Sequence, residues 1–220
     1  LSAFNVELIG EQADTVPLIA PAAFLCGHGL EDRLPGSREH HRSLIFVPAF
    51  LGEWDAVREK NRKVIQWIAD HYRGGTEVAS LCRGSYFLAE AGLLDGMPCT
   101  SHWGAIQDMR ERYPNIDLQP DAVVTDKNGI YTGGGAFSSL NLVLYLVEKF
   151  CGHEIGIQVA RNFSIQRDNV NQAHFSIFGG LHDHGDRLIG DAQAFIEANY
   201  TNEVSIDDVA DHVHMSKRNF

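Results

Sequence analysis

An apolar run passes into a helix with no loop between them at residues 80–84, and this junction constrains the fold more than any other feature of the sequence. Residues 77–81 are typical of a buried strand, and helical spacing follows at once. Such a corner is crowded, so the residues two before and two after its apex must be small, as Ser80 and Gly84 are. The sequence therefore predicts a nucleophile elbow with Cys82 at its apex.

Apolar runs and helical segments alternate on both sides of this corner. The run at 44–47 is typical of a strand buried on both faces in a parallel sheet. Asn128-Gly129 predicts the turn of a hairpin. Further extended runs lie at 4–8 and 16–20, and helices are expected at 57–72, 86–91, 104–112, 136–150 and 154–162. The segment 136–150 is apolar nearly all round, so we expect this helix to be buried against the sheet. The alternation predicts an α/β fold, with a doubly wound, mostly parallel sheet and flanking helices.

Composition excludes several classes of protein. Of the 220 residues, 44% are hydrophobic and 21% are charged, and no apolar run is long enough to span a membrane. The four cysteines (Cys26, Cys82, Cys99 and Cys151) form no CxxC pair, which argues against a zinc site or a disulfide framework and suits a reducing cytoplasm. We expect no metal and no cofactor. The chain starts at Leu1 and ends inside a motif, so we expect both ends to be cut.

The end of the chain has the pattern of the first half of a helix-turn-helix. Ser205 and Asp208 make a capping box, and apolar residues then repeat along one helical face, namely Ile206, Val209, Ala210 and Val213. Ser216 can cap a second helix, with Met215 and Phe220 in the positions of a hydrophobic staple. A second helix placed this way can enter a major groove, but an ordinary helical hairpin has the same pattern.

The charge of the chain opposes nucleic-acid binding. The net charge is -11, whereas affinity for DNA rests on neutralising phosphates. Residues 186–220 carry seven acidic side chains (Asp186, Asp191, Glu197, Glu203, Asp207, Asp208, Asp211) against three basic ones (Arg187, Lys217, Arg218). We therefore expect this fragment alone to bind DNA poorly, and most of the chain to serve another role.

The elbow is the candidate chemical site. A helix amino terminus favours a thiolate at Cys82, with Arg83 available as an additional positive charge. The next short strand ends at His102-Trp103, and if the two strands are neighbours, Cys82 and His102 meet at the edge where ligands of open α/β folds bind. A Cys/His pair fits nucleophilic catalysis and also a small-molecule pocket without turnover. For His102 alone, a structural hydrogen bond is the default.

Three other groups of residues have simpler explanations. The His/Asp cluster at 182–186 has the spacing of a flexible polar linker rather than of a metal site. The glycines at 133–135 lack the spacing and the lysine of a P-loop, and indicate a tight turn or a close approach of the backbone to the pocket. Trp54, Trp67 and Trp103 are expected to be packing residues, although Trp103 stands beside the candidate site.

Several motifs resemble those of a known family. The segments 79–84, 88–96 and 100–103 are similar to the ThiJ/PfpI domain, a class I glutamine-amidotransferase-like fold. More narrowly, the chain resembles the version fused to a carboxy-terminal AraC-type DNA-binding domain, because residues 171–175 are similar to the linker of those regulators and residues 186–220 to the opening of their AraC module. The resemblance spans essentially the full chain.

The resemblance implies a cytoplasmic, ligand-responsive transcription regulator that binds a specific DNA sequence. Residues 1–162 would form a sensor and dimerisation domain that lacks its first strand, residues 163–185 a linker, and residues 186–220 the truncated start of the helix-turn-helix domain. The implied partners are DNA, a small-molecule effector and a second copy of the chain, with no membrane. Some members of the family sense small nitrogenous compounds such as amino acids or betaines.

The same resemblance assigns the site residues. The expected ligand-binding residues are Cys82, Arg83, His102 and Trp103, and the expected DNA-binding residues are Ser216, Lys217 and Arg218. No residue is expected to be catalytic. The alternatives are a ThiJ/PfpI-type hydrolase or hydratase of a small substrate, acting through Cys82 and His102, and a regulator for which oxidation of Cys82 is the signal.

The chain departs from the pattern of the enzymes in this family. The loop at 48–52 contains one glycine, where the enzymes have a glycine-rich loop that supplies amides to an oxyanion. Their acidic partner of the cysteine would lie before residue 1, and neither Glu53 nor Asp55 is assigned to that role. In the turn before Ser216, His214 stands where the family commonly has glycine, and histidine tolerates a positive φ better than most residues.

Overall fold

The computed structural model describes residues 4–17, 23–33, 43–135, 137–165, 186–199, 201 and 204–216. The chain forms two compact units, residues 1–173 and 174–220. The division falls inside the segment that we predicted to be a linker. The domain limits at 162 and 186 stay predictions, because most of that segment lies outside the described residues.

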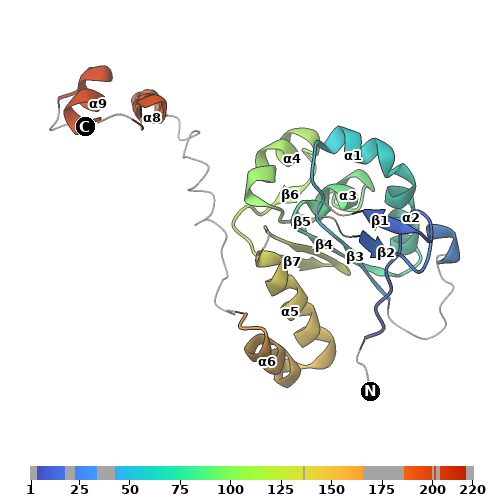
Figure 1. Cartoon of the computed structure of the whole chain (residues 1–220). Helices are drawn as coiled ribbons and strands as arrows, with labels where there is room; N and C mark the ends of the chain where they lie inside the picture. The colour runs from blue at the N-terminus through green and yellow to red at the C-terminus, as the bar shows by residue number, and fades with distance from the viewer. Residues whose placement is uncertain are drawn as a thin grey trace. The chain divides into compact units, whose positions relative to one another are not determined.

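A four-stranded sheet forms the centre of the first unit (Figure 1). Its strand order is β3-β4-β8-β7, with β3 at Leu44–Val47, β4 at Glu77–Leu81, β8 at Ile130–Gly133 and β7 at Val124–Lys127. The strands β3, β4 and β8 are parallel, and β7 runs antiparallel to β8. The predicted α/β fold with a mostly parallel sheet is therefore confirmed.

Local turn chemistry explains the antiparallel strand. Asn128 and Gly129 both have positive φ, at 55° and 75°. This is the conformation of a type I′ turn, whose twist matches that of the strands it joins. The predicted hairpin is confirmed.

Helices cover both faces of the sheet. They are α1 (Trp54–Lys60), α2 (Arg62–Arg73), α3 (Ser85–Glu90), α4 (Ile106–Arg112), α5 (Ser138–Cys151) and α6 (His153–Asn162). Val78 of β4 belongs to a core that includes residues of α1 to α4, whereas its neighbour Ala79 packs with Leu142 and Leu146 of α5. Because successive residues of a strand point to opposite faces, α5 lies across the sheet from α2 and α3 (Figure 1).

The helix predicted at 57–72 is in fact two helices. Its first turns form α1, and α2 begins after Asn61. The Asn61 side chain donates a hydrogen bond to the Val57 carbonyl at 2.7 Å, and its backbone adopts φ -111° and ψ 20°. A short amide side chain competes for backbone groups in this way, which interrupts the helix.

Two expectations about burial were wrong. Phe46 of β3 is 42% exposed, so this strand is not buried on both faces. In α5, Leu140 and Tyr145 are 45% and 39% exposed, so the helix is buried along one side only. The hydroxyl of Tyr145 instead contacts Asp126 of β7. Apolar content alone did not reveal which side of each element faces the core.

Short paired segments complete the first unit. They are β1 (Thr15–Pro17) with β2 (Ala23–Leu25), antiparallel, and β5 (Pro98–Cys99) with β6 (Asp117–Leu118), parallel, together with 3-10 turns at Leu30–Asp32, Cys82–Gly84 and Trp103–Ala105. The strand predicted at residues 4–8 does not form. The chain there is irregular, and only Ile9 makes a bridge, to His28.

The second unit contains α8 (Arg187–Asn199) and α9 (Ile206–His212). The capping box at the start of α9 is confirmed: the Ser205 hydroxyl accepts from the Asp208 amide, and the Asp208 carboxylate accepts from the Ser205 amide. Val209 and Val213 pack against α8, whereas Ile206 is 61% exposed and does not share the predicted buried face.

The turn after α9 has the expected backbone. His214 adopts φ 56°, as predicted for the position where the family commonly has glycine. Ser216 is exposed, and Met215 packs against the core between α8 and α9. The predicted start of a second helix, with Lys217, Arg218 and Phe220, lies outside the described residues. In the described part of the chain, no helix is both long and apolar enough to cross a bilayer.

Candidate functional site

The predicted elbow is present, and its backbone is strained. The strand β4 ends at Leu81, a 3-10 turn covers Cys82–Gly84, and α3 follows directly. Cys82 has φ 56°, in the left-handed region that residues other than glycine rarely adopt. A Cβ atom on Gly84 would lie 2.4 Å from the Val47 carbonyl oxygen. Only glycine fits at this position.

The strand before His102 is not paired with β4. We predicted that Cys82 and His102 would meet if their strands were neighbours, but β4 pairs with β3 and β8, and β5 pairs with β6. The link is a side chain instead. The hydroxyl of Ser101, next to His102, donates a hydrogen bond to the Cys82 carbonyl at 3.2 Å. The end of β5 and the apex of the elbow therefore meet without strand pairing.

A hollow of about 430 Å³ opens beside the elbow. It is lined by Glu53, Trp54, Arg83, Tyr86, His102, Gly104, Ala105, Asp108 and Arg112. Two of the four predicted ligand-binding residues, Arg83 and His102, line this hollow. The other two, Cys82 and Trp103, are described by the structure but do not line it.

Arg83 is held by the loop that follows β3. Its Nη1 donates to the Gly52 carbonyl at 3.2 Å, and its guanidinium lies 4.4 Å from the centre of the Phe50 ring. Both contacts leave further N–H groups for a ligand, because a guanidinium has five. The loop that lacks the glycines of the enzymes thus positions a cation at the hollow.

The hydrogen bonds of His102 determine which ring nitrogen carries its proton. The backbone N–H of Gly104 donates to Nδ1 of His102 at 3.1 Å. Burial, and then the positive charge of Arg83, lower the pKa of His102 below its ordinary value, so the ring is neutral at neutral pH. A neutral ring that accepts at Nδ1 must carry its proton on Nε2. His102 is therefore a hydrogen-bond donor at Nε2.

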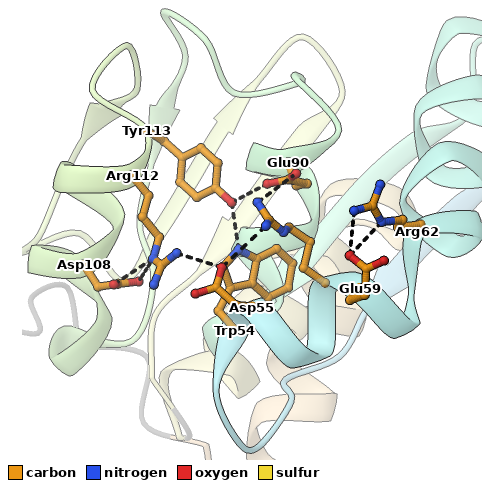
Figure 2. A network of polar contacts seen from close by, with 9 residues as sticks. Trp54, Asp55, Glu59, Arg62, Glu90, Asp108, Arg112 and Tyr113 are labelled. Atoms are coloured by element: carbon orange, nitrogen blue, oxygen red, sulfur yellow. Dashed lines mark hydrogen bonds and ion pairs between the residues drawn. The ribbon is translucent and has the colours of Figure 1, made fainter.

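The charged residues Asp108 and Arg112 of α4 form one wall of the hollow, and Figure 2 shows the network that joins them to α1. Arg112 binds Asp108 through Nε at 2.8 Å and Asp55 of α1 through Nη1 at 3.1 Å. The Tyr86 hydroxyl donates to the same Asp108 at 2.7 Å. Partial burial opposes ionisation, but the donors Arg112 and Tyr86 hold the pKa of Asp108 below its ordinary value. Asp108 is thus ionised, and it is already bound by Arg112 and Tyr86.

Sequence reasoning missed the residues of this wall. Asp108 and Arg112 are four residues apart, a spacing that by itself indicates only a stabilising pair on an exposed helix. Asp55, which we did not assign to the role of catalytic acid, pairs with Arg112 and Arg58. Nothing in the spacing of these residues predicted that α1 and α4 would meet.

The structure also bears on the other residues singled out from the sequence, namely the His/Asp cluster, the glycines and the tryptophans. Among the described residues no cluster of His, Cys, Asp and Glu can hold a metal ion, and residues 182–185 of the His/Asp cluster lie outside them. A Cβ atom on Gly135 would lie 2.9 Å from Cδ2 of His102, so the backbone approaches the site there, as predicted. Trp54 is buried in the core, and Nε1 of Trp67 donates to the Leu30 and Arg33 carbonyls, which agrees with packing roles. The ring of Trp103 lies 5.0 Å from that of His102.

Comparison with known proteins finds a family match within the first unit. Residues 52–149, which include the elbow, match the DJ-1/PfpI family. The ThiJ/PfpI family protein from Pseudomonas syringae has the same fold, with a TM-score of 0.61 and 18% identity over 95% of this chain and 76% of that structure.

The curated proteins that are similar to this chain include regulators and an enzyme. The HTH-type transcriptional regulator CdhR of Pseudomonas aeruginosa (strain ATCC 15692) is 31% identical over 152 residues, 68% of this chain and 44% of CdhR. Isonitrile hydratase of Pseudomonas putida is 32% identical over 109 residues, 50% of this chain and 46% of the hydratase. The chain thus spans less than half the length of these relatives. The predicted resemblance to helix-turn-helix regulators with a ThiJ/PfpI domain is confirmed.

Proposed function

We propose that this chain is part of a ligand-responsive transcription regulator that binds a specific DNA sequence. Residues 1–162 bind a small metabolite and form a homodimer, and residues 186–220 begin the DNA-binding domain. The similarity to CdhR and the capped helix α9 with its positive-φ turn at His214 support this proposal. We propose that the regulator acts in the cytoplasm, together with the DNA that it binds.

The observation that carries the proposal is the hydrogen bond from the Gly104 amide to Nδ1 of His102. A base that activates Cys82 needs a free nitrogen lone pair, but Nδ1 of His102 already accepts the Gly104 amide and Nε2 carries the proton. His102 in this form recognises an acceptor atom and removes no proton. The elbow thus supports ligand recognition better than catalysis.

The effector site combines the hollow with the elbow. Arg83 and His102 present N–H donors to the hollow, and Glu53 and Asp108 present carboxylates. Cys82 and Trp103 are adjacent in sequence to these donors, and we propose that they contact the ligand when it is bound. A ligand that carries an acceptor group fits the donors Arg83 and His102.

DNA recognition requires more of the DNA-binding domain than the described residues contain. Ser216 is exposed and available for a phosphate contact, and we propose that Lys217 and Arg218 contact DNA from the start of the second helix. The acidic surface of α8 and α9 opposes DNA binding by this segment alone. The complete AraC-type domain would supply the missing positive charge.

A gel-shift assay tests the DNA-binding part of the proposal. The protein with its complete carboxy-terminal domain is titrated on its own promoter region and on scrambled DNA, over a series of salt concentrations. We expect a preference for the promoter and an affinity that falls steeply with salt. Equal binding to both DNAs at every salt concentration would contradict sequence-specific regulation.

A thermal-shift screen with a metabolite library tests the sensor part. A ligand that binds only the folded state must raise the melting temperature. We expect a hit whose shift is lost in Arg83→Gln and kept in Arg73→Gln, because Arg73 pairs with Asp70 on α2 and does not line the hollow. A hit that stabilises Arg83→Gln as strongly as the wild type would place the effector elsewhere.

An enzyme that acts through Cys82 is the second candidate, favoured by the elbow and by the similarity to isonitrile hydratase. Its test is turnover of small isonitriles by the wild type and by Cys82→Ser. We expect no turnover above that of the serine variant. Turnover that depends on Cys82 would favour the enzyme and would show that His102 changes its hydrogen bonding in the reacting complex.

A further inference from the structure

The segment that carries His102 is joined to the central sheet without strand pairing. Its strand β5 pairs with β6 at Pro98 and Cys99, and in the described part of the chain the central sheet consists of β3, β4, β8 and β7. The residues that follow β5 are nevertheless fully buried, with Thr100 and Ser101 both at 0% exposure. Side-chain hydroxyls make the connections that backbone ladders make elsewhere in the sheet.

The first connection runs from α3 to the apex of the elbow. Ser85 Oγ lies 2.8 Å from Ser101 Oγ, and Ser101 Oγ lies 3.2 Å from the Cys82 carbonyl oxygen. Each hydroxyl has one proton. The shortest distances use both protons if Ser85 donates to Ser101 and Ser101 donates to Cys82. Ser85 Oγ also lies 3.3 Å from the Cys82 carbonyl oxygen, so the two hydroxyls together supply that carbonyl with a donor, whichever way the bond between them points.

The second connection runs from Thr100 through the hairpin β7–β8. The Thr100 amide donates to Thr132 Oγ1 at 2.7 Å, Thr132 lies 2.6 Å from Thr125 Oγ1, and Thr125 donates to the Pro98 carbonyl at 3.2 Å. Because the Thr125 proton goes to Pro98, the Thr132 proton goes to Thr125. This chain returns to the segment from which it started and fixes residues 98–100 against the sheet.

The two connections hold the two successive buried residues that directly precede His102. Thr100 is bound to the sheet, Ser101 is bound to the elbow, and His102 is the next residue. We infer that Ser85 and Ser101 are positioning residues, whose hydroxyls set the place of His102 relative to the left-handed Cys82. This inference concerns the geometry of the site and holds whether the site binds an effector or reacts, so failure of DNA binding would leave it untouched.

Ser80 provides a matched control. It lies on the same elbow, is also at 0% exposure, and its hydroxyl has no partner among the described residues. Removing an unpaired buried hydroxyl costs little, whereas removing Ser101 leaves the Cys82 carbonyl without that donor. Ser80→Ala and Ser101→Ala therefore differ in the hydrogen bond and hardly at all in volume or depth.

The test measures the reactivity of Cys82 and the titration of His102 in the complete chain. Alkylation by iodoacetamide is followed by mass spectrometry of the Cys82 peptide as a function of pH, with the partly exposed Cys151 as internal reference. Cys26 and Cys99 are buried, and burial raises the pKa of the Cys99 thiol to about 12, so they compete little. NMR follows the His102 ring in the same samples.

We expect Ser101→Ala to change the alkylation rate of Cys82 relative to Cys151 by about fivefold, the size of one hydrogen bond, and to move the titration of His102 toward its ordinary range. Ser80→Ala should change neither. The double variant Ser85→Ala with Ser101→Ala should change the rate at least as much as Ser101→Ala alone, because it removes both hydroxyls within reach of the Cys82 carbonyl.

Some outcomes would overturn the inference. Ser101→Ala that lowers the melting temperature but leaves both the Cys82 rate and the His102 titration at wild-type values would show a purely structural role, and so would equal changes in Ser80→Ala. If Ser101→Ala does not fold, Ser85→Ala is decisive, because it removes one of the two hydroxyls that contact the Cys82 carbonyl and leaves Ser101 in place. An unchanged Cys82 rate and His102 titration in that variant would overturn the inference as well.

Discussion

Nε1 of Trp54 donates a hydrogen bond to the hydroxyl of Tyr113 at 2.8 Å, and that hydroxyl donates in turn to Glu90 at 2.7 Å (Figure 2). Trp54 begins α1, Glu90 ends α3, and Tyr113 directly follows α4. The Tyr113 hydroxyl therefore connects α1, α3 and α4, the three helices that contribute residues to the lining of the hollow.

Tyr113→Phe should destabilise the first unit by about 1–3 kcal/mol, because it leaves the Trp54 N–H without its acceptor inside the core. Urea unfolding followed by fluorescence measures the free energy of unfolding. The control is Tyr72→Phe, whose hydroxyl donates to the Asn128 carbonyl at an exposed position. If the two variants lose the same free energy of unfolding, the hydrogen bonds of Tyr113 add no particular stability to the first unit.

Gly84→Ala should destabilise the protein by about 1–3 kcal/mol or more, because the new methyl group would meet the backbone oxygens of Val47 and Pro48 at 2.4 and 2.8 Å. Backbone cannot move aside as a flexible side chain can. Gly27→Ala is the control, since a Cβ atom there meets nothing within 4 Å. The control should stay within about 0.5 kcal/mol of the wild type. If Gly84→Ala is as stable as Gly27→Ala, the backbone around residue 84 is not packed as closely as the structure shows.

Cys82→Gly should be more stable than Cys82→Ala by about 1 kcal/mol, the reverse of the usual order at the start of a helix. The reason is the φ of 56°, which glycine adopts without a steric penalty. Thermal and urea unfolding of the two variants, side by side, measure the difference. A more stable alanine variant would mean that Cys82 leaves the left-handed region in solution.

His102 should make stability fall as the solution is acidified. Burial and the charge of Arg83 lower its pKa in the folded state, so the unfolded chain binds the proton more readily. The free energy of unfolding contributed by His102 is therefore fully present above about pH 6.5 and is lost as the pH falls from there through the folded-state pKa. Urea unfolding between about pH 5 and 8 should show a smaller acid loss in His102→Gln than in the wild type. If both proteins lose the same stability on acidification, groups other than His102 cause the loss.

The sequence by itself determined the local elements of this protein. The strands β3 and β4, the hairpin turn at Asn128-Gly129, the capping box at Ser205 and the crowded elbow were all predicted, because each depends on residues a few positions apart. The family resemblance was predicted as well, since its motifs are also short and contiguous. The break at Asn61 shows the limit of such patterns, because one side chain overrode a helical periodicity that continued through it.

Only the tertiary structure decided how the site is assembled. The bond from Ser101 to Cys82 joins residues 19 apart in sequence, the bond from Thr100 to Thr132 joins residues 32 apart, and Arg112 reaches Asp55 across 57 positions. Periodicity assigns each side chain to a face of its own element, but it does not say which other element that face will meet. Serine and threonine hydroxyls carry no periodic signal, and their role depends on the acceptor that folding brings within 3 Å or so. For that reason the sequence predicted Cys82 and His102 as a pair, while the structure alone shows what holds them together.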